Sequence, residues 1–304
     1  MTVPNKSISM FPIGVFDSGV GGLTVVRSLR EQLPQETYCY FGDTARVPYG
    51  TKSAETIRRY SVEIARFLMS HDAKIIVVAC NTASSTALDD IRSAFSGPVV
   101  GVVEPGIRAA LQATRKGRIG IIGTKSTIRS GAYQQRLRQN DASLHIVAQP
   151  CPLFVPLVEE GWEQDPITRQ IAERYLAPLV AEKVDVVIMG CTHYPLLQGV
   201  IRQVLGDEVA LVSSAEEVSK EVKTKLREMN GLAPQKIYKD LFYASDDIAG
   251  FQRLCERFCG TVEAVFAEAG ADFFAFVQQA HRFKESLASR PMQWFQPLEE
   301  TPAR

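Results

Sequence analysis

Short apolar runs rich in Val and Ile alternate with longer amphipathic stretches along most of this chain. The predicted strands are Ile13–Phe16, Tyr38–Phe41, Ile75–Ala79 and Val99–Val103. The predicted helices between them are Leu23–Leu33, Ser53–His71 and Ser85–Phe95. Such strand–helix alternation favours parallel strands buried under helices. The chain is therefore predicted to have an α/β fold.

The pattern repeats in the second half. The segment Arg118–Thr124 resembles Pro12–Ser18, and aligning Ile13 with Ile119 gives an offset of 119 − 13 = 106. Aligning Cys80 with Cys191 gives a nearly equal offset of 191 − 80 = 111. Chance similarity between strands is the alternative explanation. The two offsets favour duplication into two similar parallel-sheet α/β domains, related by pseudo-twofold symmetry around a cleft.

A change of domain is expected near Glu104-Pro105-Gly106, which reads as a hinge. Beyond Ser213 the chain carries further helix and one more strand candidate, Lys239–Ala244, which we expect to return to the first domain. The predicted first domain is therefore 1–104 plus 214–304, and the second is 105–213.

The chain from Gly270 onward lacks clear strand–helix alternation but is rich in aromatic residues, namely Phe273, Phe274, Phe276, Trp294 and Phe295. We expect an added helix there, either on the surface or in an oligomer contact. The last residues, Leu298–Arg304, are expected to fray.

The charge and composition of the chain do not indicate a nucleic-acid or membrane partner. Lys plus Arg and Asp plus Glu both number 34 among 304 residues, so the net charge is zero. No nucleic-acid or membrane partner is evident, because no basic excess and no apolar run of about 20 residues is present. The N-terminus lacks a signal-peptide pattern. We expect a cytoplasmic protein with six reduced cysteines, and the Cys and His spacing predicts no metal site.

Two cysteines occupy matching positions, each directly after an apolar run. Cys80 follows Ile75–Ala79, and Cys191 follows Val186–Gly190. In parallel α/β sheets ligands bind beyond the carboxyl ends of strands, where helix N-termini lower the pKa of a thiol. A lone cysteine there is more often a small buried hydrophobe. The matched pair instead predicts two acid/base groups, whereas Cys39, Cys151, Cys255 and Cys259 are assigned to packing.

Hydrogen-bonding residues follow both cysteines. Asn81, Thr82 and Thr192 suit helix capping or the binding of a substrate carboxylate, and both roles are compatible. His193 lies two residues after Cys191 and could relay or stabilise a proton there.

Two loops after strands are further candidates. Asp17–Thr24 is rich in glycine, but neither the Gly-Lys-Ser/Thr of a P-loop nor GxGxxG is present. Asp17 suits an ammonium group or a general-base helper, and a tight turn is the alternative. The segment Asp43–Gly50 contains Pro-Tyr-Gly, which predicts a turn, and its backbone N–H groups could also bind a carboxylate. Glu159 and Glu160 are by default a solvated pair.

Five motifs occur in order along the chain, namely Asp17-Ser18-Gly19-Val20-Gly21-Gly22-Leu23, Pro48-Tyr49-Gly50, Ala79-Cys80-Asn81-Thr82-Ala83, Gly190-Cys191-Thr192-His193-Tyr194-Pro195-Leu196 and Phe242-Tyr243-Ala244-Ser245-Asp246. From about Ile13 to about Phe266, this ordered set resembles the bacterial glutamate racemases of the aspartate/glutamate racemase family. The resemblance implies cofactor-independent interconversion of L- and D-glutamate, the latter for peptidoglycan. The chain departs from the family core by its longer segment beyond Gly270.

The resemblance also implies roles for particular residues. Cys80 and Cys191 would be the two acid/base groups, with Cys80 attacking D-glutamate and Cys191 attacking L-glutamate. The catalytic helpers would be Asp17, Asp43, Glu159 and His193. The substrate-binding positions would be Asp17, Ser18, Pro48, Tyr49, Gly50, Asn81, Thr82, Thr192 and His193. A racemase of the same family acting on aspartate or another amino acid is the alternative, and the Pro-Tyr-Gly segment favours glutamate.

Other readings of the same residues stay open. A cysteine hydrolase or amidotransferase would need only one essential cysteine. A two-lobed binding protein would hold an amino acid without exchange at Cα. A homodimer also stays open, and regulation by a cell-wall precursor or an interaction with gyrase, known for some family members, is left undecided by these residues.

Overall fold

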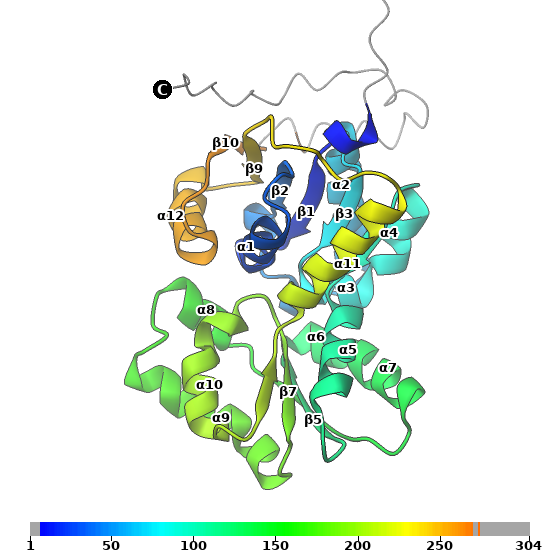
Figure 1. Cartoon of the computed structure of the whole chain (residues 1–304). Helices are drawn as coiled ribbons and strands as arrows, with labels where there is room; N and C mark the ends of the chain where they lie inside the picture. Colours follow the sequence, from blue (N-terminus) through cyan, green and yellow to red (C-terminus); the bar gives the residue numbers. More distant parts are fainter. Residues whose placement is uncertain (1–6, 270–272, 274–304) are drawn as a thin grey trace, which may run out of the picture.

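The computed structural model describes residues 7–269 and residue 273. The described strands form two separate parallel sheets, which lie in two α/β units, one above the other in Figure 1. Within the described residues, no helix is long and apolar enough to cross a membrane.

The first sheet has the strand order β10-β9-β2-β1-β3-β4, with all neighbours parallel. Its strands are β1 (Ile13–Asp17), β2 (Tyr38–Gly42), β3 (Ile75–Val78), β4 (Val99–Gly101), β9 (Asp240–Ala244) and β10 (Ala264–Glu268). Val and Ile fill both faces of the central strands, because helices cover the sheet on both sides.

The second sheet repeats part of that order as β6-β5-β7-β8. Its strands are β5 (Arg118–Gly123), β6 (His145–Pro150), β7 (Val186–Gly190) and β8 (Ala210–Val212). In the first sheet Ile13 lies opposite Ile75, and in the second Ile119 lies opposite Val186. The offset from Ile75 to Val186 is 186 − 75 = 111, the value expected from the two cysteines. The predicted fold class, two similar parallel-sheet α/β domains, is confirmed.

The helices pack on both faces of each sheet. In the first unit they are α1 (Leu23–Gln32), α2 (Ala54–Ser70), α3 (Asn81–Thr86), α4 (Leu88–Ala94), α11 (Ser214–Glu228) and α12 (Ile248–Cys259). In the second they are α5 (Val103–Ala113), α6 (Lys125–Ser130), α7 (Ala132–Asn140), α8 (Phe154–Glu159), α9 (Pro166–Ala181) and α10 (Gln198–Leu205). Short 3₁₀ turns lie at Ile8–Met10, Thr44–Arg46, Tyr49–Thr51 and Tyr194–Leu197.

The chain passes between the two units twice, and the helices that follow these two connections pack against each other. One enters α5 and the other leads from β8 into α11, which packs on α1 and α5 (Figure 1). A Cβ atom on Gly106 would lie only 2.6 Å from the Ser214 hydroxyl, so the glycine permits this close approach. The expected hinge at Glu104–Gly106 thus lies in the first turn of α5 rather than in a loop.

One predicted helix differs from the structure. The stretch Ser85–Phe95 is divided at Ala87 into α3 and α4, and α3 begins earlier, directly after Cys80. The Ser84 hydroxyl of α3 accepts a hydrogen bond from Val102 N–H at 3.0 Å, which ties α3 to the residue that precedes α5. Strands β6, β8 and β10 were not identified from the sequence.

From the aromatic tail, Phe273 is buried, with its ring 4.7 Å from that of Phe41 and 5.5 Å from that of Phe67. The other residues named in the tail, and the expected fraying of Leu298–Arg304, lie outside the described residues.

Candidate active site

A cavity of about 300 Å³ lies where the carboxyl ends of strands from both sheets meet, and both candidate cysteines line it. The other predicted site residues along it are Ser18, Pro48, Tyr49, Gly50, Asn81, Thr82, Glu159, Thr192 and His193. Residues that the sequence did not single out also line it, namely Val47, Thr51, Thr124, Lys125, Pro152, Val155 and Pro156. Asp17, Asp43 and Glu160 are not among its lining residues.

Cys80 follows the end of β3 after one residue, Ala79, and occupies the N-cap position of α3. Its sulfur lies 3.5 Å from the Ser18 hydroxyl, and its side chain is 4% exposed. The expectation that the strand end lowers the pKa of this thiol is wrong. Burial, together with the nearby Asp17 carboxylate, raises the pKa of Cys80 to about 12, although hydrogen bonds from Ala83 and Ser18 oppose the shift. Cys80 is therefore held as a thiol in this state.

Cys191 lies directly after β7 and next to a cation. Its sulfur lies 3.8 Å from His193 Nδ1, and His193 Nε2 lies 2.9 Å from Glu159 Oε1. Burial disfavours the charged imidazole, but the hydrogen bonds to Cys191 and Glu159 outweigh it and raise the pKa of His193 to about 10. At neutral pH this places an imidazolium beside the sulfur of Cys191.

Asp17 is buried behind the cavity wall at the end of β1. Its carboxylate accepts a hydrogen bond from Gly19 N–H at 2.9 Å and lies 3.4 Å from the Thr192 hydroxyl. Burial raises the pKa of Asp17, and the positive charge of His193 partly offsets this. Asp17 thus links the loop after β1 to the loop that carries Cys191.

Asp43 lies beneath the cavity rather than on it. Its carboxylate accepts hydrogen bonds from the Tyr49 hydroxyl at 2.5 Å, from Ser245 at 2.9 Å and from Arg46 Nε at 2.8 Å. The Pro48-Tyr49-Gly50 segment that lines the cavity is therefore anchored through the side chain of Tyr49.

Thr124 joins the two units on the far side of the cavity. Its hydroxyl lies 3.0 Å from that of Thr82, and both hydroxyls also contact that of Thr127. Thr124 follows β5 as Ser18 follows β1, and 124 − 18 = 106 is the offset between the repeated strands. The internal repeat could therefore have identified Thr124 from the sequence. By contrast, nothing in the local pattern singles out Lys125, whose exposed side chain adds a positive charge to the lining.

The remaining cysteines, Cys39, Cys151, Cys255 and Cys259, are buried free thiols that do not line this cavity. Within residues 7–269 and 273, no group of three or more His, Cys, Asp or Glu side chains is arranged to hold a metal ion.

Known proteins are similar to this chain in sequence and in fold. The family model of the Asp/Glu/Hydantoin racemases matches residues 13–221. A glutamate racemase from Geobacter metallireducens is 51% identical over 82% of this chain and 92% of its own length. A glutamate racemase structure from Thermus thermophilus with β-chloro-D-alanine has 46% identity and a TM-score of 0.79, covering 87% of this chain and 99% of its own.

A third comparison includes a bound amino acid. The glutamate racemase structure from Francisella tularensis in complex with D-glutamate has 34% identity and a TM-score of 0.80, over 86% of this chain and 97% of its own. The match of the family model covers well over half of the chain, and the identities extend over most of it. The chain therefore belongs to the Asp/Glu/Hydantoin racemase family.

Proposed function

We propose that this protein is a cofactor-independent glutamate racemase, with Cys80 and Cys191 as its two acid/base groups. The observation that carries this proposal is that two cysteines from equivalent strand ends of two repeated sheets line one small cavity. The similar proteins named glutamate racemase, one of them with bound D-glutamate, support the substrate. The role proposed is supply of D-glutamate for peptidoglycan in the cytoplasm, a reducing compartment that keeps both thiols free.

In the proposed reaction one thiolate takes the Cα proton and the opposing thiol donates its own proton to the other face. With L-glutamate, Cys191 starts as thiolate beside the His193 imidazolium, and Cys80 starts as thiol. The site ends with a Cys191 thiol and a Cys80 thiolate, so the charge balance is kept. D-glutamate requires the reverse starting state. The two titrations are expected to be coupled, because the thiols share one cavity.

The other polar residues are proposed to bind and polarise the substrate. Donors at Asn81, Thr82 and Thr192 stabilise the charge that grows on the α-carboxylate, and the loss of one such donor typically costs about 3 kcal/mol. Asp17 is proposed to favour the ammonium group. Ser18, Pro48, Tyr49 and Gly50 complete the substrate contacts, with Asp43 acting through Tyr49.

Circular dichroism of pure protein with L- or D-glutamate tests the substrate. Aspartate is the control, because a pocket that distinguishes one methylene group discriminates by roughly 10- to 200-fold. Decay of either glutamate enantiomer to the racemate supports the proposal. Faster racemisation of aspartate than of glutamate would instead support the alternative substrate.

Replacing each cysteine tests the two-thiol mechanism. Cys80→Ser and Cys191→Ser are each expected to abolish racemisation while glutamate still binds, because each face of Cα needs its own proton carrier. Single-turnover product formed in D₂O should carry deuterium at Cα. Normal turnover in either variant would exclude the mechanism, and retention of the original hydrogen would argue against exchangeable thiol protons.

A further inference from the structure

Arg257 lies in the last turn of α12, in the first unit, and its side chain contacts the end of α8, in the second unit. In Figure 1, α12 lies above α8. Its guanidinium donates a hydrogen bond to the Val158 carbonyl at 2.5 Å and one to the Glu159 carbonyl at 3.4 Å. It also pairs with the carboxylate of Glu163. The last carbonyls of a helix lack partners within it, and a basic side chain can cap them. Arg257 therefore fixes the backbone of the residue whose carboxylate contacts His193.

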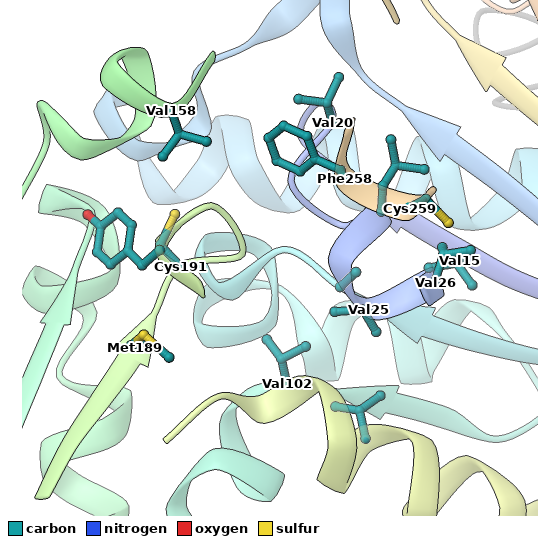
Figure 2. Close-up of a cluster of buried hydrophobic side chains, with 14 of the residues drawn as sticks. Val15, Val20, Val25, Val26, Val102, Val158, Met189, Cys191, Phe258 and Cys259 are labelled. Carbon is teal, nitrogen blue, oxygen red and sulfur yellow. The ribbon is translucent and has the colours of Figure 1, made fainter. Parts of the chain in front are cut away.

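The next residue of α12 contacts the other member of that pair. Phe258 is 2% exposed, and its ring lies edge-on to His193 with 5.6 Å between ring centroids. Figure 2 shows Phe258 in the buried cluster that also contains Val158 and Cys191. Consecutive residues of one helix thus contact both sides of the Glu159–His193 hydrogen bond, from across the boundary between the units.

We propose that Arg257 and Phe258 are positioning residues for the Glu159–His193 pair, and thereby for proton transfer at Cys191 but not at Cys80. The contacts of Cys80 support this restriction, because within the described residues α12 makes no hydrogen bond or ring contact with Cys80, Ser18 or Ala83. The inference rests on the proposed racemase function.

Rates in the two directions of the reaction cannot by themselves separate an effect at Cys191 from an effect at Cys80. Enantiomers have equal free energy in solution, so any variant must lower kcat/KM by the same factor in both directions. The two half-reactions are separated instead by isotope effects. Slower proton transfer to Cys191 makes cleavage of the Cα–H bond more rate-limiting only for the enantiomer that Cys191 deprotonates.

The decisive experiment compares Arg257→Met with wild type on Cα-deuterated L- and D-glutamate. We expect kcat/KM to fall about tenfold, within the range for residues coupled by contact. The deuterium effect on kcat/KM should rise for one enantiomer, L-glutamate under the proposed assignment, and not for its mirror image. Arg257→Lys, which keeps one donor, should recover part of the loss.

A double-mutant cycle provides the second measurement. If Arg257 acts through Glu159, then Arg257→Met combined with Glu159→Gln should be no slower than the slower single variant. Arg253→Met is the matched control and should resemble wild type. Arg253 lies one turn earlier on α12 and makes no hydrogen bond or ion pair with the described residues.

Equal changes in the isotope effect for both enantiomers, or additive losses in the cycle, would overturn this inference. If Arg257→Met does not fold, the same two measurements on Phe258→Leu decide. If the wild type racemises glutamate and needs both cysteines, either of these overturning results rejects only the role of α12. Absence of Cα exchange in the wild type rejects the proposed function itself.

Discussion

Cys80 and Cys191 hold equivalent places in the repeat, but different charges surround them. The carboxylate nearest Cys80 is Asp17, which with burial raises the pKa of that thiol to about 12. His193, with its pKa raised to about 10, lies beside Cys191. The repeat explains why the two sulfur atoms occupy equivalent positions. Residues that differ between the halves, Asp17 near Cys80 and His193 near Cys191, give the two thiols different electrostatic surroundings.

His193→Gln should make stability less dependent on pH. Because the folded pKa is raised from 6.5 to about 10, protonation of His193 stabilises the fold fully below pH 6.5, and this contribution is lost as pH rises through about 10. We expect wild type to exceed the variant by about 2 kcal/mol at pH 6, typical of charged hydrogen bonds. Urea unfolding at pH 6, 8 and 10 checks this. A difference that grows with pH would contradict the assigned imidazolium.

Gly21→Ala should impair catalysis by steric overlap. A Cβ atom at this position would overlap the Thr192 hydroxyl and the imidazole of His193. We expect kcat/KM to fall about 100-fold, because displacements near 1 Å can have this effect. Gly199→Ala is the control, since a Cβ atom there would meet nothing within 4 Å. Equal steady-state kinetics for both variants would show that the close approach is unimportant.

At the scale of elements, the site depends on short helices that begin where strands end. Cys80 caps α3, whose first residue is Asn81. Asn81 Nδ2 donates a hydrogen bond to the Tyr133 hydroxyl on α7 at 2.7 Å, and both residues are buried. The position of α3 is thus tied to a helix of the second unit.

Tyr133→Phe should weaken this link. It leaves a buried amide donor of Asn81 without its acceptor, which typically costs about 1–3 kcal/mol. We expect lower stability together with a higher KM for glutamate, measured by thermal unfolding and steady-state kinetics. Lower stability with unchanged KM would show that the link supports the fold but not substrate binding.

At the scale of the whole molecule, the candidate active site and a buried ion pair lie at opposite ends of the strands of the first sheet. Lys74 directly precedes β3, whose other end leads to Cys80, and Glu36 lies shortly before β2. Lys74 Nζ contacts Glu36 Oε2 at 2.5 Å, and both side chains are 0% exposed. Burial lowers the pKa of Lys74, while Glu36 opposes this shift.

Lys74→Met should reduce stability without changing the chemistry. Removal of one partner leaves the other charge buried and unpaired, which typically costs about 3–5 kcal/mol. We expect a lower Tm but unchanged kcat/KM at 25 °C for the folded fraction. Lys220→Met is the control, because its pairs with Glu216 and Glu217 are solvent-exposed and should contribute little. A large fall in kcat/KM would show that the buried ion pair and the candidate active site, at opposite ends of the strands, are coupled.

Most strands and the repeat could be predicted because buried parallel strands leave continuous apolar runs such as Ile75–Ala79. Strand β10 could not be predicted, since it depends on pairing with β9, and the break at Ala87 could not, since no Gly or Pro marks it in the sequence. The site residues that belong to sequence motifs, such as Cys80 and Cys191, could be predicted. Thr124 was missed although its repeat partner, Ser18, had been identified.

The sequence alone determined the duplicated α/β fold and the pair of cysteines, because hydrophobic periodicity and the two nearly equal offsets can be read from the order of residues along the chain. Only the tertiary structure decided that Asp43 supports Tyr49 from below, that Cys80 is kept as a thiol and that α12 contacts the Glu159–His193 pair. These properties depend on burial and on contacts between residues distant in the sequence, such as Glu159 and Arg257, whose proximity arises only when the two units pack together.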